Sequence, residues 1–336
     1  MKTQILMPTV ENIKKASEVI KKGGLVAFPT ETVYGLGANG LNEAAVKKIY
    51  ETKGRPSDNP MILHIAEYED LRKLVKEVNS VSELLSETFW PGPLTLVLKK
   101  KDKVPSMATG GLDTVAVRMP AHPVALALIK ESGTPIAAPS ANLSGRPSPT
   151  RAKDVLNDLN NRVEIILEGG DCEVGIESTV VDLTKDGEIL ILRPGLVTKG
   201  EIEEALNTCG YENITVGYAN EEDALSPKSP GMKYTHYSPK AEMIILKGSK
   251  EKVLAEIERI KKEGYLGLGS GNKTGVIYFK DLDAKQAVKQ FFAKLRDLDE
   301  EGVELIISVA PDKTDEVAYA LMNRMLKASG YKVIKV

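Results

Sequence analysis

This sequence of 336 residues is poor in cysteine and in aromatic side chains, and it carries almost no net charge. The two cysteines, Cys172 and Cys209, lie far apart, which excludes a paired-thiol redox or zinc motif and fits a reducing compartment. The formal net charge is −2, which argues against a protein that binds nucleic acid with its whole surface. No apolar run reaches the length of a membrane span, and the first residues do not resemble a secretory leader. We therefore expect a cytoplasmic protein without membrane contact.

Several familiar catalytic motifs are also missing from the sequence. There is no GxxxxGK[ST] loop, which excludes an ordinary P-loop ATPase, and there is no HExxH motif or nucleophile elbow. Residues 267–271 (GLGSG) resemble a dinucleotide loop, but they lie between two predicted strands, so we interpret them as a turn. Any chemistry would rest on positioning and charge neutralisation rather than on a covalent nucleophile.

The pattern of predicted elements indicates an α/β protein with two domains. Charged residues make up 27% of the chain and apolar residues 42%, as in ordinary globular proteins. Short apolar strands alternate with helices over residues 1–206, which we predict to be the catalytic domain. Periodicity is lost over the predicted linker, 207–240. A second alternation over 241–336 predicts a smaller, mostly parallel α/β domain of Rossmann-like type.

The most unusual stretch of the chain is 53–64, which combines two cations, two prolines and a histidine with a short apolar run. Pro56 favours an extended backbone at Arg55, and in an extended chain residues i and i+2 point to the same side. We therefore expect Lys53 and Arg55 to aim at one spot, beside His64 on a buried strand. The alternative is a solvated basic turn with a histidine satisfied inside the core.

Other polar groups occur where predicted strands meet loops. Residues 29–37 combine hydroxyls, one acid and two glycines, which is typical either of a loop that brings backbone close to a ligand or of a plain glycine turn. In 114–119, Thr114 and Arg118 fall on one face of a predicted strand. Arg118 would then project from the sheet, although an edge-strand arginine that reaches water gives the same pattern.

Taken together, these strand ends carry four cations and three small hydrogen-bonding side chains. They are Lys53, Arg55, Arg118, Ser140, Asn142, Ser178 and Arg193. Arginine guanidinium groups bind phosphate and carboxylate alike through paired hydrogen bonds. We interpret the set as a polyphosphate cradle.

The predicted linker ends in a proline-rich segment, 226–239. Proline content favours an inert connector, but a bare connector has no need of Tyr234, His236 and Tyr237 close together. Long connections without periodic structure are often functional lids. Both interpretations, connector and lid, stay open at this point.

The motifs described above resemble those of the threonylcarbamoyl-AMP synthases of the YrdC type, in the longer two-domain form of that family. The matching residues are Pro29–Gly37, Lys53, Arg55, Pro60, His64, Arg118, Pro120, Ser140–Gly145, Glu177–Asp182, Arg193–Gly195 and Pro230–Pro239. The resemblance implies a twisted mixed sheet around a central basic cavity. It also implies the reaction of L-threonine, bicarbonate or CO₂ and ATP to threonylcarbamoyl-AMP, pyrophosphate and water.

The resemblance further implies roles for individual residues. Those expected to bind threonine are Thr32, His64, Arg118 (on the carboxylate) and Ser178. Those expected to bind ATP and pyrophosphate are Lys53, Arg55, Asn59, Thr114, Ser140, Asn142, Ser148 and Arg193. Mg²⁺ would be held through the phosphates, Lys53 and Arg55 would stabilise charge, and no certain catalytic base is identified. The product would pass to a separate tRNA threonylcarbamoyl transferase complex, with weak or no direct tRNA binding by this chain.

Two other classes of function compete with this expectation. A binding module could bind RNA directly. RNA recognition usually needs exposed aromatic side chains, however, and aromatic residues are only 5% of the chain. A carbamoyltransferase with another acceptor would use the same nucleotide cradle. Pyrophosphate release from ATP, measured with and without L-threonine, separates the three.

Overall fold

The computed structural model describes residues 2–220, 236–265, 273–279, 283–311 and 315–336. The chain divides into two compact units. Residues 1–144 and 148–234 form the first unit, and residues 145–147 and 235–336 form the second unit.

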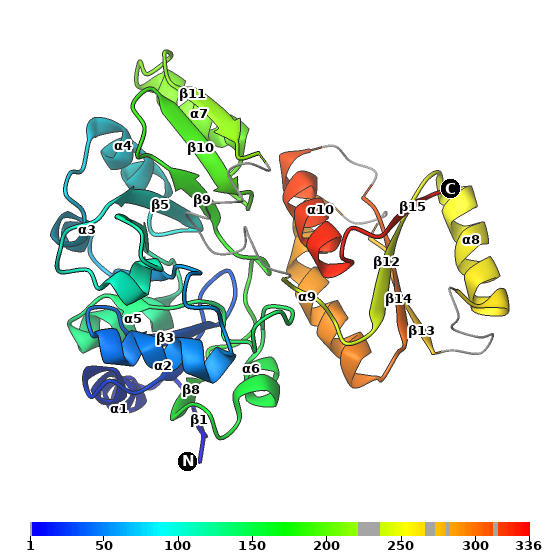
Figure 1. The fold of residues 1–336 in the computed structure, drawn as a ribbon, viewed down its shortest axis with the longest axis horizontal. Coiled ribbons are helices and arrows are strands. Elements are labelled where there is room, and N and C mark those ends of the chain that lie inside the picture. The colour runs from blue at the N-terminus through cyan, green and yellow to red at the C-terminus, as the bar shows by residue number, and fades with distance from the viewer. Residues whose placement is uncertain (1, 221–235, 266–272, 280–282, 312–314) are drawn as a thin grey trace. The chain divides into compact units, whose positions relative to one another are not determined.

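The first unit is built on a mixed sheet, which in the described residues contains eleven strands. The sheet runs from β1 beside the N-terminus to β11, and both parallel and antiparallel pairs occur along it (Figure 1). In spatial order the strands are β1 (Gln4–Leu6), β8 (Ile165–Leu167), β2 (Val26–Phe28), β3 (Gly35–Asn39), β7 (Ile136–Ala137), β4 (Ile62–His64), β6 (Thr114–Arg118), β5 (Leu94–Lys99), β9 (Thr179–Asp182), β10 (Glu188–Arg193) and β11 (Thr215–Tyr218). The mixed sheet confirms the predicted fold class.

Most helices of the first unit begin at a residue whose side chain accepts a hydrogen bond from the backbone. They are α1 (Val10–Lys21), α2 (Glu43–Lys53), α3 (Tyr68–Leu74), α4 (Ser80–Phe89), the 3₁₀ helix η1 (Ser106–Thr109), α5 (Pro123–Ser132), α6 (Ala152–Leu159) and α7 (Lys199–Thr208). The side chain of Thr9 accepts a hydrogen bond at the start of α1, and Asn42 does so at the start of α2. Thr198 and Glu201 form a reciprocal capping box on α7, as their spacing predicts.

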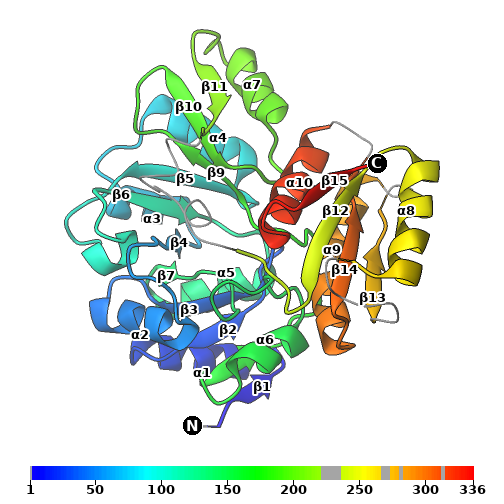
Figure 2. The same ribbon diagram turned by 45° about the vertical axis from the view of Figure 1, so that its right-hand side comes forward.

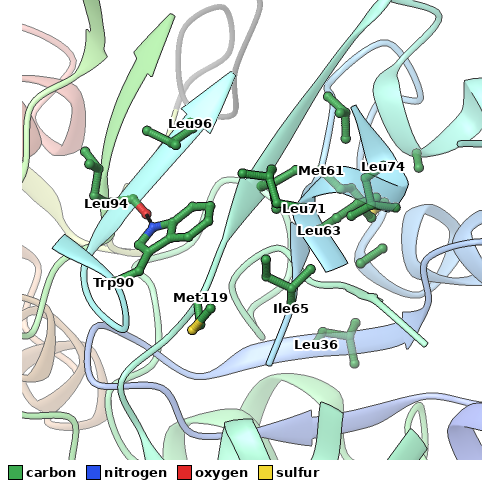
Figure 3. Packing of buried hydrophobic residues seen from close by; sticks show 14 of the residues in the cluster. Leu36, Met61, Leu63, Ile65, Leu71, Leu74, Trp90, Leu94, Leu96 and Met119 are labelled. Carbon is green, nitrogen blue, oxygen red and sulfur yellow. Dashed lines mark hydrogen bonds between the residues drawn. The ribbon is translucent and has the colours of Figure 1, made fainter. Parts of the chain in front are cut away.

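The core of the first unit lies on both faces of the sheet. On one face, Leu63, Leu71, Trp90 and Leu96 belong to a large buried cluster that joins β4 and β5 to the helices beside them (Figure 3). The Trp90 indole Nε1 donates to the Leu94 carbonyl over 2.7 Å, so this polar atom is satisfied inside the cluster. Alternate residues of the same strands face the other side, and that side carries the candidate site.

Two elements differ from what the sequence predicts. Residues 35–37 were expected to be loop, but they begin β3, which pairs with β2. A Cβ at Gly37 would lie 2.7 Å from both Ile136 Cγ2 and Phe28 Cε1, so this glycine permits close strand packing rather than a turn. The predicted linker also contains a strand, β11, which pairs with β10. Only Val216 of β11 is buried, so the strand has too weak a hydrophobic pattern to be recognised.

The second unit contains a four-stranded sheet in which every described pair is parallel, as the sequence predicts. Its spatial order is β13 (Thr274–Ile277), β14 (Leu305–Val309), β12 (Glu242–Lys247) and β15 (Val333–Lys335). Helix α8 (Lys250–Glu263) covers one face, and α9 (Ala284–Glu300) and α10 (Glu316–Ala328) cover the other (Figures 1 and 2). The predicted turn at 267–271 lies outside the described residues. Within the described ranges, no helix is long and apolar enough to cross a membrane.

Candidate functional site

The candidate site begins on one face of the central strands of the first unit. Side chains that point to this face of the sheet form a small apolar cluster, which contains Ile62, Val97, Ala116, Val180 and Leu192. Because side chains alternate across a strand, the polar residues two positions away lie on the same face. These polar residues are His64, Thr95, Arg118 and Ser178. Each of the four is buried.

Arg118 is held inside the protein and does not reach water, so the edge-strand interpretation is wrong. Its strand, β6, is paired on both sides, and the side chain is 3% exposed. The guanidinium Nη1 donates to Thr32 Oγ1 over 2.9 Å, and Nε donates to the Gly92 carbonyl over 3.1 Å. Nη2 lies 2.6 Å from Glu31 Oε1. Contacts with Gly92, Thr32 and Glu31 therefore fix the orientation of the guanidinium plane.

His64 lies directly opposite Arg118 in the parallel pair of β4 and β6. Burial, assisted by the positive charges of Arg118 and Arg193, lowers the pKa of His64 to about 3. Its ring packs edge-to-face on Phe28 at 6.3 Å, and within the described part of the chain its Nδ1 has no hydrogen-bond partner. At neutral pH, His64 is therefore a neutral imidazole with one open nitrogen.

Ser178 connects Arg193 to the same face of the sheet. Arg193 donates from Nε to the Ser178 carbonyl over 3.0 Å and from Nη2 to Ser178 Oγ over 3.1 Å. Ser178 Oγ also lies 2.7 Å from Thr95 Oγ1. A Cβ at Gly195 would come within 2.5 Å of the Thr179 amide nitrogen, so the turn after Arg193 packs closely on β9. Arg193, expected on the nucleotide side, thus lies beside a residue expected to bind threonine.

Lys53, Ser140 and Asn142 form a second group of polar side chains. Lys53 is the last residue of α2, and its buried Nζ donates to the carbonyls of Ser140 and Asn142. Ser140 Oγ donates to Asn142 Oδ1. The family resemblance implies that all three residues bind ATP, and these hydrogen bonds join them in one group.

The predicted reason for pairing Lys53 with Arg55 is wrong, because the backbone between them is not extended. Lys53 is helical, and Gly54 caps α2 in the left-handed region at φ 62°. The half-buried Arg55 then donates to Asn59 Oδ1 over 2.6 Å and to the Pro60 carbonyl over 2.9 Å. The two cations contact different partners. Asn59 positions Arg55, and the Tyr50 hydroxyl donates to the Asn59 carbonyl.

The segment 30–35 joins the two groups. Thr32 accepts from Arg118 at one end. At the other end, the Ala141 amide donates to the Tyr34 carbonyl over 2.8 Å, and Gly35 pairs with Ser140. The segment that the sequence left open as a ligand loop or a plain glycine turn therefore connects the Arg118 group with the Ser140 group.

The remaining predicted residues are spread more widely. Thr114 lies at the far end of β6, four residues from Arg118, or about 13 Å along a strand. Ser148 is buried, and its Oγ donates to Glu177 Oε1 over 2.5 Å. Of the three predicted lid residues, Tyr234 lies outside the described residues. Tyr237 is buried in the second unit, with its ring 5.1 Å from that of Phe292.

Two buried carboxylates, Glu31 and Glu177, are not among the site residues predicted from the sequence. Each precedes a predicted threonine-binding residue in the chain, Thr32 and Ser178 respectively. A single acid beside hydroxyl residues at a strand end was the available signal. Among the described residues, no group of three or more His, Cys, Asp or Glu side chains could hold a metal ion.

The chain is similar to known proteins in sequence and in fold. A family model described as "Telomere recombination" (Sua5_yciO_yrdC) matches residues 18–195. A second, described as "Threonylcarbamoyl-AMP synthase, C-terminal domain", matches residues 197–330. The threonylcarbamoyl-AMP synthase of Pyrococcus abyssi is 48% identical over 332 residues, which cover 96% of each chain. The Bacillus subtilis enzyme of that name is 46% identical over 333 residues, covering 96% of this chain and 94% of the relative.

Solved structures are similar over the full chain. Pyrococcus abyssi Sua5 complexed with L-threonine has a TM-score of 0.88 at 45% identity, covering 100% of this chain and 99% of that one. A double variant of Pyrococcus abyssi Sua5 has a TM-score of 0.90 at 44% identity, covering 99% and 98%. Both units of this chain therefore have counterparts in one solved protein.

Proposed function

Since this chain belongs to the threonylcarbamoyl-AMP synthase family, we propose that it makes threonylcarbamoyl-AMP from L-threonine, bicarbonate or CO₂, and ATP. Pyrophosphate is released, together with water where bicarbonate is the carbon source. The observation that carries the proposal is the 48% identity to a threonylcarbamoyl-AMP synthase over 96% of both chains. The product serves the modification of tRNA to N6-threonylcarbamoyladenosine.

Threonine is assigned to the group around Arg118. A guanidinium plane fixed by Gly92 and Thr32 suits a carboxylate, which takes two parallel hydrogen bonds. The neutral His64 and the hydroxyl of Ser178 lie on the same face and offer partners for the amine and side-chain hydroxyl. Because His64 is uncharged at neutral pH, it adds no positive charge that would repel the substrate ammonium.

ATP is assigned to the group that contains Lys53. Lys53 and Arg55 supply positive charge, and Ser140, Asn142 and Ser148 supply small polar side chains that bond phosphate or sugar oxygens. Asn59 keeps Arg55 in place through the hydrogen bond to its guanidinium. Arg193, bonded to Ser178, lies where it can neutralise charge between the two substrates. Thr114, at the far end of β6, is the weakest member of the assignment.

The proposed reaction depends on alignment of the bound substrates. The threonine amine attacks CO₂ and loses a proton, or condenses with bicarbonate and releases water, to give a carbamate. A carbamate oxygen then attacks the α-phosphorus of ATP, the bond to the β-phosphate oxygen breaks, and pyrophosphate leaves. Lys53 and Arg55 take up the charge that develops on the phosphates. Carbamates decompose readily in water, so a buried site protects the intermediate as well as aligning it.

Mg²⁺ enters with ATP in this proposal and is held mainly through the phosphates. The donor set fits such a role, because Mg²⁺ commonly takes one or two carboxylates in addition to phosphate oxygens. Glu177, hydrogen-bonded to Ser148, is a carboxylate on the nucleotide side. When bound, the ion would neutralise phosphate charge together with Lys53 and Arg55.

The linker and the second unit are assigned supporting roles. We assign the catalytic domain to residues 1–206, the linker to 207–240 and the C-terminal domain to 241–336. Tyr234, His236 and Tyr237 would form a lid, with Tyr237 anchored by Phe292. If a chain truncated after residue 225 keeps threonine-dependent ATP cleavage coupled to product, the lid assignment is wrong.

We place the protein in the cytoplasm, where it would pass its product to a separate tRNA threonylcarbamoyl transferase complex. Direct tRNA binding is expected to be weak or absent, because the near-neutral net charge provides little attraction for RNA.

One assay tests the proposed function against its rivals. Purified protein is incubated with ATP, Mg²⁺ and bicarbonate, and pyrophosphate release is measured with L-threonine, with L-serine, with L-valine and without amino acid. The expected result is release that depends on L-threonine, because serine lacks the methyl group and valine lacks the hydroxyl. Release without amino-acid preference would indicate a carbamoyltransferase with another acceptor. No release under any condition would favour an RNA-binding module.

A further inference from the structure

The carboxylate of Asp299 joins three separate segments of the second unit. Asp299 lies near the end of α9, and its side chain is 3% exposed. Oδ1 accepts a hydrogen bond from the Lys240 amide over 2.8 Å, two residues before β12. Oδ2 accepts Arg146 Nη2 over 3.0 Å, from the segment 145–147. A buried carboxylate used in this way forms charge-assisted hydrogen bonds, which are stronger than neutral ones.

The segment 145–147 belongs to the second unit although its chain neighbours, Ser144 and Ser148, belong to the first. Two further contacts hold it. The Ser238 amide donates to the Gly145 carbonyl over 2.8 Å. The buried guanidinium of Arg296 donates to the Pro147 carbonyl, from Nε over 3.1 Å and also from Nη2. Each of the three residues is therefore bonded to the second unit.

This short segment lies within the nucleotide-side part of the chain. Asn142 precedes Gly145 by three residues, and Ser148 follows Pro147 directly. Successive Cα atoms are about 3.8 Å apart, so a shift of Pro147 by an ångström or more must be taken up at Ser148. Pro147 and Pro149 flank Ser148, and the fixed φ of proline leaves few torsions to absorb the shift.

We propose that Asp299, acting through Arg146, is a positioning residue for the ATP side of the site. In this view the C-terminal domain contributes to the reaction by holding the segment 145–147, and thereby Ser148 and Asn142, in place for the nucleotide. Neither Asp299 nor Arg146 needs to touch a substrate. The inference rests on the proposed function, and it names the residues by which the C-terminal domain would act.

The test uses the full-length protein and two single substitutions, each of which removes one partner of the same ion pair. Asp299→Asn keeps Oδ1 as the acceptor for the Lys240 amide but replaces Oδ2 by an amide that cannot accept from Arg146. Arg146→Ala removes the donor. Both variants are expected to raise KM for ATP by about tenfold and to leave KM for L-threonine within about twofold, as expected for the loss of one charge-assisted bond.

The double variant Arg146→Ala with Asp299→Asn distinguishes a coupled pair from two independent effects. If Asp299 acts through Arg146, the double variant has the same KM for ATP as either single variant, because the second change removes nothing further. Arg146→Lys, which keeps the charge, is expected to recover part of the loss. Effects that multiply in the double variant would overturn the proposal.

Arg259→Ala is the matched control, because Arg259 forms exposed ion pairs with Glu256 and Glu263 on α8 of the same unit. It is expected to leave both KM values unchanged. Thermal unfolding of each variant reports whether the second unit still folds. Variants that fold and bind ATP as the wild type does would refute the inference while leaving the proposed function intact. A wild-type protein without threonine-dependent activity would refute the proposed function itself.

Discussion

Glu31 Oε1 lies 2.6 Å from Arg118 Nη2, and both side chains are almost completely buried. Each side chain is the counter-charge of the other, because Arg118 otherwise donates to the neutral Gly92 carbonyl and Thr32 hydroxyl. The site proposed for threonine thus contains a neutralised cation whose orientation is set before any ligand arrives.

Glu31→Gln is expected to destabilise the protein by about 3–5 kcal/mol, because it leaves the buried Arg118 charge uncompensated. Urea unfolding at pH 7 measures the loss. Glu67→Gln is the control, since Glu67 pairs with Lys130 on the surface and its loss should leave the unfolding midpoint essentially unchanged. Equal stability of Glu31→Gln and the wild type would show that the buried pair contributes nothing net to folding.

Arg118→Lys is expected to raise KM for L-threonine by about 10–100-fold while KM for ATP changes little, because an ammonium cannot reproduce the planar pair of donors. Steady-state pyrophosphate release measures both constants. Arg72→Lys, at an exposed pair with Glu83, provides the same chemical change away from the site. A larger effect on ATP than on threonine would contradict the assignment of Arg118.

Lys53→Ala is expected to lower kcat by about 100-fold or more, because it removes positive charge from the proposed path of the leaving pyrophosphate. It also removes the donor that ties Ser140 to Asn142. Lys47 lies on the same helix and its side chain is exposed, so the control variant Lys47→Ala should retain wild-type activity. If both alanine variants behave alike, the role given to Lys53 is incorrect.

His64 is expected to make stability depend on pH below neutrality. Its pKa is about 3 in the folded protein against 6.5 for an ordinary histidine, so the unfolded state binds the extra proton between these values. This contribution to stability is fully present well above pH 6.5 and is lost as the pH falls through 6.5 toward 3, with a slope that approaches about 1.4 kcal/mol per pH unit.

The comparison of His64→Gln with the wild type isolates this contribution. Between pH 6.5 and 5.5, the variant should lose about 1 kcal/mol less stability than the wild type, as measured by urea unfolding. The pKa of the half-buried His122 is also lowered, but His122 is present in both proteins and cancels in the difference. If the free energy of unfolding changed with pH in the same way for both proteins, His64 would bind its proton equally well in the folded and unfolded states.

The elements of this fold were largely predictable because each carries a local signal. Alternation of apolar and polar residues marked β6, and capping side chains marked α1 and α7. The strand β11 was missed, because a strand with one buried residue has almost no hydrophobic pattern. The expectation for Lys53 and Arg55 failed because Gly54 ends a helix in the left-handed region, which Pro56 does not reveal.

The sequence by itself determined which residues carry the polar chemistry, since His64 and Arg118 are polar positions in otherwise apolar strands whose period is fixed by backbone geometry. Only the tertiary structure decided which of them meet. The pairing of β4 with β6 sets His64 beside Arg118, and the loop before β3 brings Glu31 to the same guanidinium. Strand order and register depend on contacts between segments distant along the chain, and no local pattern contains that information.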